Sequence, residues 1–333
     1  MPRPRLLFWD LPEPSADGCL PEKSTPRKIL EKLKVANQLS VFGVSGCGKT
    51  RSMVELLSQR WGFYFNAAAH DCVSADMNCF IEAITSSIHG EDRGMGVRER
   101  NNHRAKRGTY LLLLTRLVIL RHCLRAHKGK QSFSSKHWML LQVCPAEFSD
   151  IFTDLYGRFM AKFFNRNTNM LKLEHHVKVS LHDIRRLLIQ QDLPNFKVDT
   201  RLLFILDEAQ ILGDKDNGYF VSQGWEEEDR PLLSPVLHAL QYVGDSIQGG
   251  IGIIYCGTGL SNYSLEWAEG SAAGVKNVER PNLRFVEFQA WEGRESIQAY
   301  VEGLRDGLRD EKARMKLDEL LPQPAIDMLF KRL

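Results

Sequence analysis

Short apolar runs alternate along this chain with segments in which apolar residues recur at helical spacing. Five of the runs have the composition of strands, and they cover residues 39–42, 61–66, 202–206, 252–256 and 285–288. Apolar strands that are joined by helical segments form parallel sheets with both faces covered. The pattern therefore predicts an α/β fold in which helices cover a parallel sheet.

Residues 67–200, between the second and third of these strands, have almost no strand signal. Their apolar spacing predicts helices near residues 74–88, 109–126, 135–143, 147–164 and 178–191. Residues 90–107 are rich in Arg, Asn and Gly and are predicted to form an exposed loop. So much helix between two strands of one sheet indicates a large helical insertion.

The ends of the chain differ from this alternating region. Residues 1–24 include five prolines and are predicted to form an extended arm. A helix then runs to about residue 35, with Thr25 as its cap and Pro26 at its first position. Residues 25–290 form the predicted core domain, and the rest of the chain is predicted to be helical near residues 294–309, 311–320 and 324–332.

The first predicted strand runs into a glycine-rich segment, which reads Gly43, Val44, Ser45, Gly46, Cys47, Gly48, Lys49 and Thr50. It fits the phosphate-binding loop G-x-x-x-x-G-K-[ST], and residues 50–59 continue as a helical pattern. Glycines allow positive φ angles, so that backbone N–H groups at a helix N-terminus can surround phosphate oxygens. Lys49 is expected to bind the β- and γ-phosphates, Thr50 to ligate Mg²⁺, and Arg51 to lie in the same nucleotide site. A glycine-rich turn before a helix is the structural alternative.

The third predicted strand ends in two carboxylates, Asp207 and Glu208. Asp207 could complete the Mg²⁺ site, and Glu208 could orient and deprotonate an attacking water. An Asp-Glu pair also suits an ordinary helix N-terminus, but its combination with the phosphate loop favours catalysis. The adjacent Glu is typical of ATPases of the additional-strand type rather than small GTPases. The sequence also lacks the guanine signature Asn-Lys-x-Asp, so ATP is the expected nucleotide.

Two further residues lie next to later strands. Thr258 follows the fourth strand and could sense the γ-phosphate or position the water, whereas a hydroxyl in a turn is the alternative. Arg280 precedes the last strand, where it could act as an arginine finger, either within the chain or toward a neighbouring subunit of a homo-oligomer. Arg284 is expected to lie in the strand instead. An ordinary surface arginine is the alternative for Arg280.

Composition changes this picture in one respect. The chain is 43% hydrophobic and 26% charged, with a net charge of +3, as is usual for a globular protein. Residues 93–136, however, carry twelve Lys and Arg residues against one acid, Glu99. This asymmetry predicts a surface for nucleic acid or an acidic partner, with Arg104, Lys106 and Arg107 as clustered candidates. A solvated basic face is the alternative.

The cysteines and apolar runs bear on the compartment. Seven scattered cysteines without a C-x-x-C pair argue against a disulfide framework and a zinc ribbon, and favour a reducing, intracellular compartment. Residues 6–9 are too short for the apolar core of a signal peptide, which spans roughly 7–15 residues. The longest apolar run, residues 111–120, is interrupted by Thr115 and Arg116 and is about half the length of a membrane span. We therefore expect a core helix there and no membrane segment.

These motifs and their flanking residues resemble the NTPase module of fungal Crinkler-type effector proteins. The resemblance extends from about residue 8 to the end, diverges over residues 71–102, and rests mainly on residues 39–57, 61–66, 206–212, 233–238 and 253–261. It implies an AAA/STAND-like P-loop NTPase with ATP and Mg²⁺, acting in a host cytoplasm or nucleus. Residues 291–333 would then begin a helical lid, which we expect to be incomplete. The ubiquitin-like N-terminal domain of such effectors, with its translocation motif, and a nuclease constellation are not seen in this sequence.

Two functions use the same predicted residues. One is an ATP-hydrolysing regulator or effector module. The other is a nucleotide-dependent switch with negligible turnover, which reports ATP by changing partners. Both need the phosphate loop and Asp207, so the sequence barely separates them.

Overall fold

The computed structural model divides the chain into two compact units, residues 1–286 and 287–333, which are described separately. Within them the structure describes residues 11–13, 20, 24–43, 46–68, 73–88, 94–127, 133–145, 149–164, 169–190, 196–197, 200–214, 218–221, 229–247, 250–258, 283–288, 298, 301–302, 305–306, 308, 310–322, 324–325 and 327.

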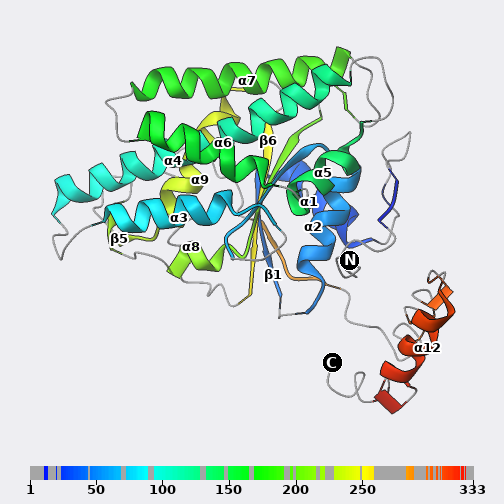
Figure 1. Ribbon diagram of the computed structural model, residues 1–333. Coiled ribbons are helices and arrows are strands. Elements are labelled where there is room, and N and C mark those ends of the chain that lie inside the picture. Colours follow the sequence, from blue (N-terminus) through cyan, green and yellow to red (C-terminus); the bar gives the residue numbers. More distant parts are fainter. Residues whose placement is uncertain are drawn as a thin grey trace. The chain divides into compact units, whose positions relative to one another are not determined.

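A sheet of five parallel strands forms the centre of the described part of the larger unit (Figure 1). Its strands are β1 (Gln38–Phe42), β2 (Gly62–Asn66), β3 (Leu202–Asp207), β6 (Ile251–Gly257) and β7 (Leu283–Phe285). Their spatial order is β2-β3-β6-β1-β7, and every neighbouring pair is parallel. All residues of β2, β3 and β6 are buried, as in a sheet that is covered on both faces. The predicted α/β fold with a parallel sheet is confirmed.

Helices cover the sheet on both sides (Figure 1). They include α1 (Thr25–Val35), which packs on β1, and α2 (Lys49–Gln59), which packs on β3; α9 (Leu233–Asp245) packs on β6. The short α8 (Gln210–Asp214) follows β3 and contacts α9. Ser24 rather than Thr25 caps α1, because the Ser24 hydroxyl accepts from the backbone N–H of Arg27.

The predicted insertion is a group of helices built around one long helix. Its elements are α3 (Asp76–Ser87), α4 (Met95–Ala126), α5 (Ser135–Val143), α6 (Ile151–Phe159), the π-helix η2 (Met160–Phe164) and α7 (Met170–Gln190). The central helix α4 packs against α3, α6, α7 and α9. In Figure 1 these helices lie mainly on the side of the sheet opposite α1 and α2.

The prediction of a loop over residues 90–107 is wrong for the described part of this range, because residues 95–107 form the first half of α4. The buried residues of this half are Asn101 and Ala105, followed by Gly108, and because all three are polar or small they leave no apolar stripe in the sequence. Gly108 is needed for close helix packing: a Cβ atom at this position would lie 2.7 Å from the Phe80 ring of α3. Because the residues at this tight helix contact are small, the sequence lacks the apolar periodicity that would predict the helix.

Other element boundaries also differ from the prediction. Helix α7 starts at Met170 instead of residue 178, and α6 starts at Ile151 instead of residue 147 and changes to π geometry after Phe159. The last strand is Leu283–Phe285 rather than residues 285–288. The two-residue strands β4 (Phe220–Val221) and β5 (Asp229–Arg230) pair antiparallel and were too short to predict.

The remaining parts are described more briefly. In the smaller unit α12 (Glu311–Leu320) is capped by the Asp310 side chain and confirms the helix predicted over residues 311–320. The helices predicted near residues 294–309 and 324–332 lie largely outside the described residues. Of the predicted N-terminal arm, Leu11 and Leu20 are buried, and the Gln59 amide donates to the carbonyl groups of residues 12 and 13.

Candidate active site

The carboxyl ends of β1, β6 and β3 lie side by side. In the register of the sheet Phe42 is beside Gly257, and Leu206 is beside Tyr255. Ligands of open parallel sheets bind at this edge, outside the carboxyl ends of the strands. The glycine loop after β1, the acid pair at the end of β3 and Thr258 after β6 therefore meet at one place.

The glycine loop has the backbone conformation that its sequence predicts. Gly46 and Gly48 have φ angles of 83° and 88°, a region that side chains disfavour. A Cβ atom at either position would meet nothing within 4 Å, so the loop borders open space. Gly48 also begins α2 without a capping side chain. Val44 and Ser45 lie outside the described residues.

Lys49 folds back over the loop from the first position of α2. Its side chain is largely buried, and its Nζ donates to the Gly43 carbonyl oxygen at 2.7 Å and lies 3.8 Å from the Cys47 thiol. Arg51, in contrast, points along the helix, where its Nε pairs with Glu55 Oε1 at 2.7 Å. The structure thus places Lys49 inside the loop and Arg51 in a pair on α2.

Asp207 joins the loop to the acid strand. Its side chain is fully buried, and its Oδ2 accepts a hydrogen bond of 2.9 Å from the Thr50 hydroxyl and one of 2.7 Å from the Tyr64 hydroxyl. Its Oδ1 accepts from the backbone N–H of Glu208 at 3.0 Å and from the Cys256 thiol at 3.2 Å. Thr50 and Asp207, the two residues predicted to hold Mg²⁺, are therefore in direct contact.

Glu208 is held in an unusual conformation. Its φ angle is 54°, and among the described residues it is the one non-glycine residue with a positive φ. A residue in the left-handed region costs about 1–3 kcal/mol and is concentrated at functional sites. The Gln210 amide donates to the Glu208 carboxylate and also to the Thr258 hydroxyl, at 3.3 Å from the latter. Gln210 thus connects Glu208, the predicted base, with Thr258, the predicted sensor of the γ-phosphate.

Three residues of this site were missed by sequence reasoning: Tyr64, Gln210 and Cys256. Tyr64 belongs to the apolar-looking run of β2, and Cys256 to that of β6. The sequence contained one signal, which concerns Tyr64. This residue lies two positions before Asn66 and therefore on the same face of β2, and Asn66 pairs with Asp207 in the sheet. Such a signal is readable only once the strand order is known.

The predicted arginine finger is not placed, because Arg280 lies outside the described residues. Arg284 lies in β7, as predicted, and its carbonyl oxygen accepts from the Lys32 ammonium at 3.1 Å.

The three candidate phosphate-binding residues of the basic segment have different partners within the chain. Arg104 donates to the Ser87 carbonyl of α3, whereas Arg107 donates to the Phe164 carbonyl of η2. Lys106 lies over the Tyr242 ring of α9, 4.7 Å from its centroid, and burial lowers the pKa of this lysine. Arg104 and Arg107, three positions apart, are neighbours on one face of α4, whereas Lys106 points elsewhere, so a phosphate site at all three residues stays a prediction.

Other cations of residues 93–136 also have partners within the chain. Arg98 pairs with Asp229 at 2.5 Å, and Lys136 pairs with Glu13 at 2.5 Å. Arg116 and Asp76 form an ion pair of 2.7 Å in which both side chains are fully buried. Part of the basic charge of this segment is therefore paired with acids of the same chain.

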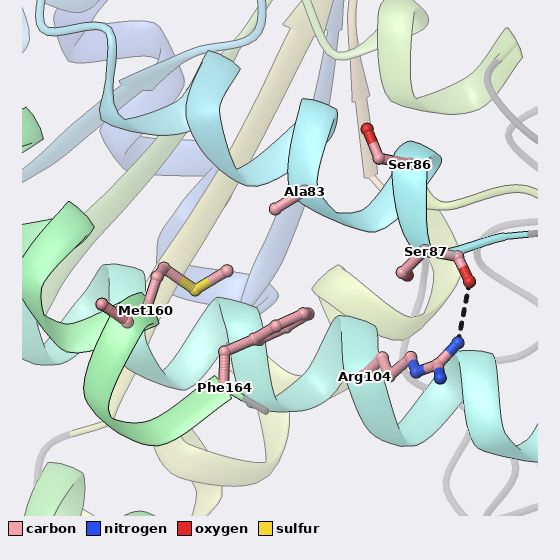
Figure 2. A pocket seen from close by; sticks show the side chains of 7 residues that line it. Ala83, Ser86, Ser87, Arg104, Met160 and Phe164 are labelled. Carbon is pink, nitrogen blue, oxygen red and sulfur yellow. Dashed lines mark hydrogen bonds between the residues drawn. The ribbon is translucent and has the colours of Figure 1, made fainter. Parts of the chain in front are cut away.

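A surface cavity of 470 Å³ lies within the insertion, between α3, α4 and η2. Figure 2 shows the side chains that line it and the hydrogen bond from Arg104 to the Ser87 carbonyl. Its walls combine apolar groups with two hydroxyls and one guanidinium, and they consist of Ala83, Ser86, Ser87, Arg104, Met160, Ala161 and Phe164. None of these residues belongs to the glycine loop or the acid pair.

A scan against protein-family models, a search of curated proteins and a search of solved structures give no match to this chain. The resemblance to Crinkler-type NTPase modules therefore stays a prediction. Among the described helices, none has the length and apolar character required to cross a membrane.

Proposed function

We propose that this chain is an ATP-hydrolysing P-loop NTPase of the additional-strand, AAA/STAND-like type. The observation that carries the proposal is the hydrogen bond between Thr50 and Asp207, which lie 157 positions apart in the chain and meet at 2.9 Å. The phosphate loop and the acid strand each fit a pattern by themselves. Their contact supports a single site in which a hydroxyl and a carboxylate lie where a P-loop enzyme holds its metal ion.

The strand order supports the additional-strand type. In that type an extra strand separates the strand before the phosphate loop from the strand that ends in the acid pair. Strand β6 has this place, between β1 and β3. Thr258 follows β6 and is hydrogen bonded to Gln210, next to Glu208. This arrangement supports a role for Thr258 in positioning the γ-phosphate or the water.

The residues present fit ATP and Mg²⁺. The positive φ angles and open surroundings of Gly46 and Gly48 leave room for phosphate groups beside the loop. The Thr50 hydroxyl donates a hydrogen bond to Asp207, so the lone pairs of the Thr50 oxygen remain available for a cation. Mg²⁺ bound by the Thr50 hydroxyl oxygen, with Asp207 in its outer shell, would neutralise the charge that develops on the phosphates.

The protein side chains then have separate roles. Lys49 supplies a positive charge to the phosphates from within the loop. Glu208 orients a water molecule and accepts its proton, and Gln210 holds the Glu208 carboxylate in place. An arginine finger, for which Arg280 is the candidate, would complete the charge stabilisation within the chain or across a homo-oligomer.

A switch with negligible turnover is the second candidate. It is favoured by one observation: the carboxylate of Glu208 is already engaged by the Gln210 amide. A base that stays engaged in this way would allow ATP binding without efficient hydrolysis. Steady-state phosphate release by the purified protein distinguishes the two functions.

The resemblance to Crinkler-type modules supports an effector role in a host cytoplasm or nucleus as part of this proposal. Nucleic-acid binding through residues 93–136 is the weaker candidate, since Arg98, Arg116 and Lys136 have acidic partners within the chain. Among the described residues of α4, the exposed arginines Arg100, Arg104 and Arg125 would have to carry it.

The proposal is tested by replacing Lys49. We expect Lys49→Ala to abolish ATP binding, measured with a fluorescent nucleotide, because the charge that neutralises the phosphates is lost. Lys34→Ala is the matched control, since Lys34 is exposed on α1 and pairs with Glu31. Equal ATP affinities for the two variants, or no ATP binding by the unaltered protein, would exclude the proposed site.

A further inference from the structure

The carboxylate of Asp207 is saturated with hydrogen bonds. A carboxylate offers about four lone-pair positions, and four donors surround this one. Thr50 and Tyr64 donate to Oδ2, whereas Cys256 and the backbone N–H of Glu208 donate to Oδ1. Rotation of the carboxylate about its Cβ–Cγ bond would break hydrogen bonds at both oxygens.

Two of these donors were not predicted as site residues. Tyr64 is on β2 and Cys256 is on β6, the strands on either side of β3. The ordinary pKa values of a phenol and a thiol, about 10 and about 8.5, lie above neutral pH. Both groups therefore keep their protons at neutral pH and act as donors. The thiol also lies 3.7 Å from the Leu206 carbonyl, but the carboxylate is closer and charged.

The position of Tyr64 is fixed from the helical insertion. Its backbone N–H donates to the Gln142 side chain of α5 at 3.0 Å, and the Trp138 indole donates to the Gly62 carbonyl at 2.7 Å. Strand β2 is at the edge of the sheet, so these side chains satisfy backbone groups that no further strand pairs with in the described part of the chain. Helix α5 thus holds the strand that carries the phenol.

We propose that Tyr64 and Cys256 are positioning residues for Mg²⁺: they clamp Asp207 from both sides of β3 so that its Oδ2 faces Thr50. This inference rests on the proposed function. Partners that orient the ligands of a metal ion usually contribute about 10–100-fold to its affinity. A clamp on Asp207 should therefore affect the Mg²⁺ requirement and leave metal-free nucleotide contacts unchanged.

The test is Tyr64→Phe, which removes one hydroxyl and keeps the ring. Tyr156→Phe is the matched control, because the Tyr156 hydroxyl is also buried but has no hydrogen-bond partner among the described residues. We expect Tyr64→Phe to raise the Mg²⁺ concentration for half-maximal ATP binding by about 10–100-fold. ATP affinity in EDTA should not change, and the control should match the unaltered protein in both measurements.

Each outcome has one meaning. Equal Mg²⁺ requirements for Tyr64→Phe and Tyr156→Phe would overturn the clamp and leave the proposed function intact. Absence of Mg²⁺-dependent ATP binding in the unaltered protein would overturn both.

If Tyr64→Phe does not fold, as judged by circular dichroism, Cys256→Ala is compared with Cys256→Ser, which keeps a donor. The alanine variant alone should then need more Mg²⁺, and equal requirements would overturn the clamp.

Discussion

Two aspartates in the described part of the chain, Asp207 and Asp76, are completely buried in opposite surroundings. Asp207, at the end of the sheet, accepts four hydrogen bonds, and among the described residues no ion pair reaches it. Asp76, at the start of α3, pairs with Arg116 in the middle of α4. In that pair Asp76 Oδ2 and two of the guanidinium nitrogens have no hydrogen-bond partner within the described ranges.

This difference in partners distinguishes the candidate site at Asp207 from the structural ion pair at Asp76. Neutral donors hold Asp207 in place without cancelling its charge, so the charge stays available to a cation. Arg116 cancels the charge of Asp76, and its guanidinium also lies 4.0 Å from the centroid of the Phe152 ring. Substitutions near Asp207 should therefore change chemistry more than stability, and those near Asp76 should do the reverse.

The largest effect is expected at Glu208. Glu208→Gln should bind ATP and release phosphate more slowly by a factor on the order of 10²–10⁴, because an amide cannot accept the proton of the water. The free energy of unfolding should hardly change, since the two side chains have nearly the same shape. Steady-state phosphate release and urea denaturation measure the two quantities. Equal rates for Glu208→Gln and for the exposed control Glu31→Gln would remove Glu208 from the mechanism.

A large loss of stability is expected at the other aspartate. Arg116→Met leaves the buried Asp76 without its cation and should lower the free energy of unfolding by about 3–5 kcal/mol. Urea denaturation measures this loss. Replacing Asp76 by Leu in the same protein should recover much of it, because no unpaired charge then remains.

Arg121→Met is the control on the same helix. Arg121 is partly exposed and lies 3.8 Å from Asp183, and such a surface pair contributes about 0–1 kcal/mol. Similar losses for Arg116→Met and Arg121→Met would contradict the distinction between the buried pair and an ordinary one.

The smallest effect is expected on the surface of α4. If the protein binds duplex DNA, replacing Arg104, Lys106 and Arg107 together by Ala should lower the salt dependence of binding by no more than one phosphate contact, because Arg104 is the exposed residue of the three. Their side chains face α3, α9 and η2 rather than one common partner. Removing one phosphate contact would reduce the slope by about 0.9, so a decrease near three would show that all three residues bind DNA. Titrations at several salt concentrations measure the slope.

Local signals in the sequence determined much of this protein. Apolar runs predicted β2, β3 and β6, because strands that are buried on both faces need apolar side chains throughout, whereas the shorter and partly exposed β7 was misplaced by two residues. The glycine pattern predicted a loop with positive φ angles after β1, since such angles are a local property of Gly46 and Gly48. The apolar run around Arg116 was correctly predicted to be a core helix.

Only the tertiary structure decided the contacts that complete the site and the insertion. Tyr64, Cys256 and Gln210 were not predicted as site residues, and they reach Asp207 and Glu208 through the strand order and the turn after β3. The first half of α4 is helical because its small residues fit against α3, which no apolar periodicity reveals. The sequence also could not reveal the partners of the basic residues, because these partners come from distant segments. A contact between distant segments depends on packing, and the sequence of either segment alone does not contain it.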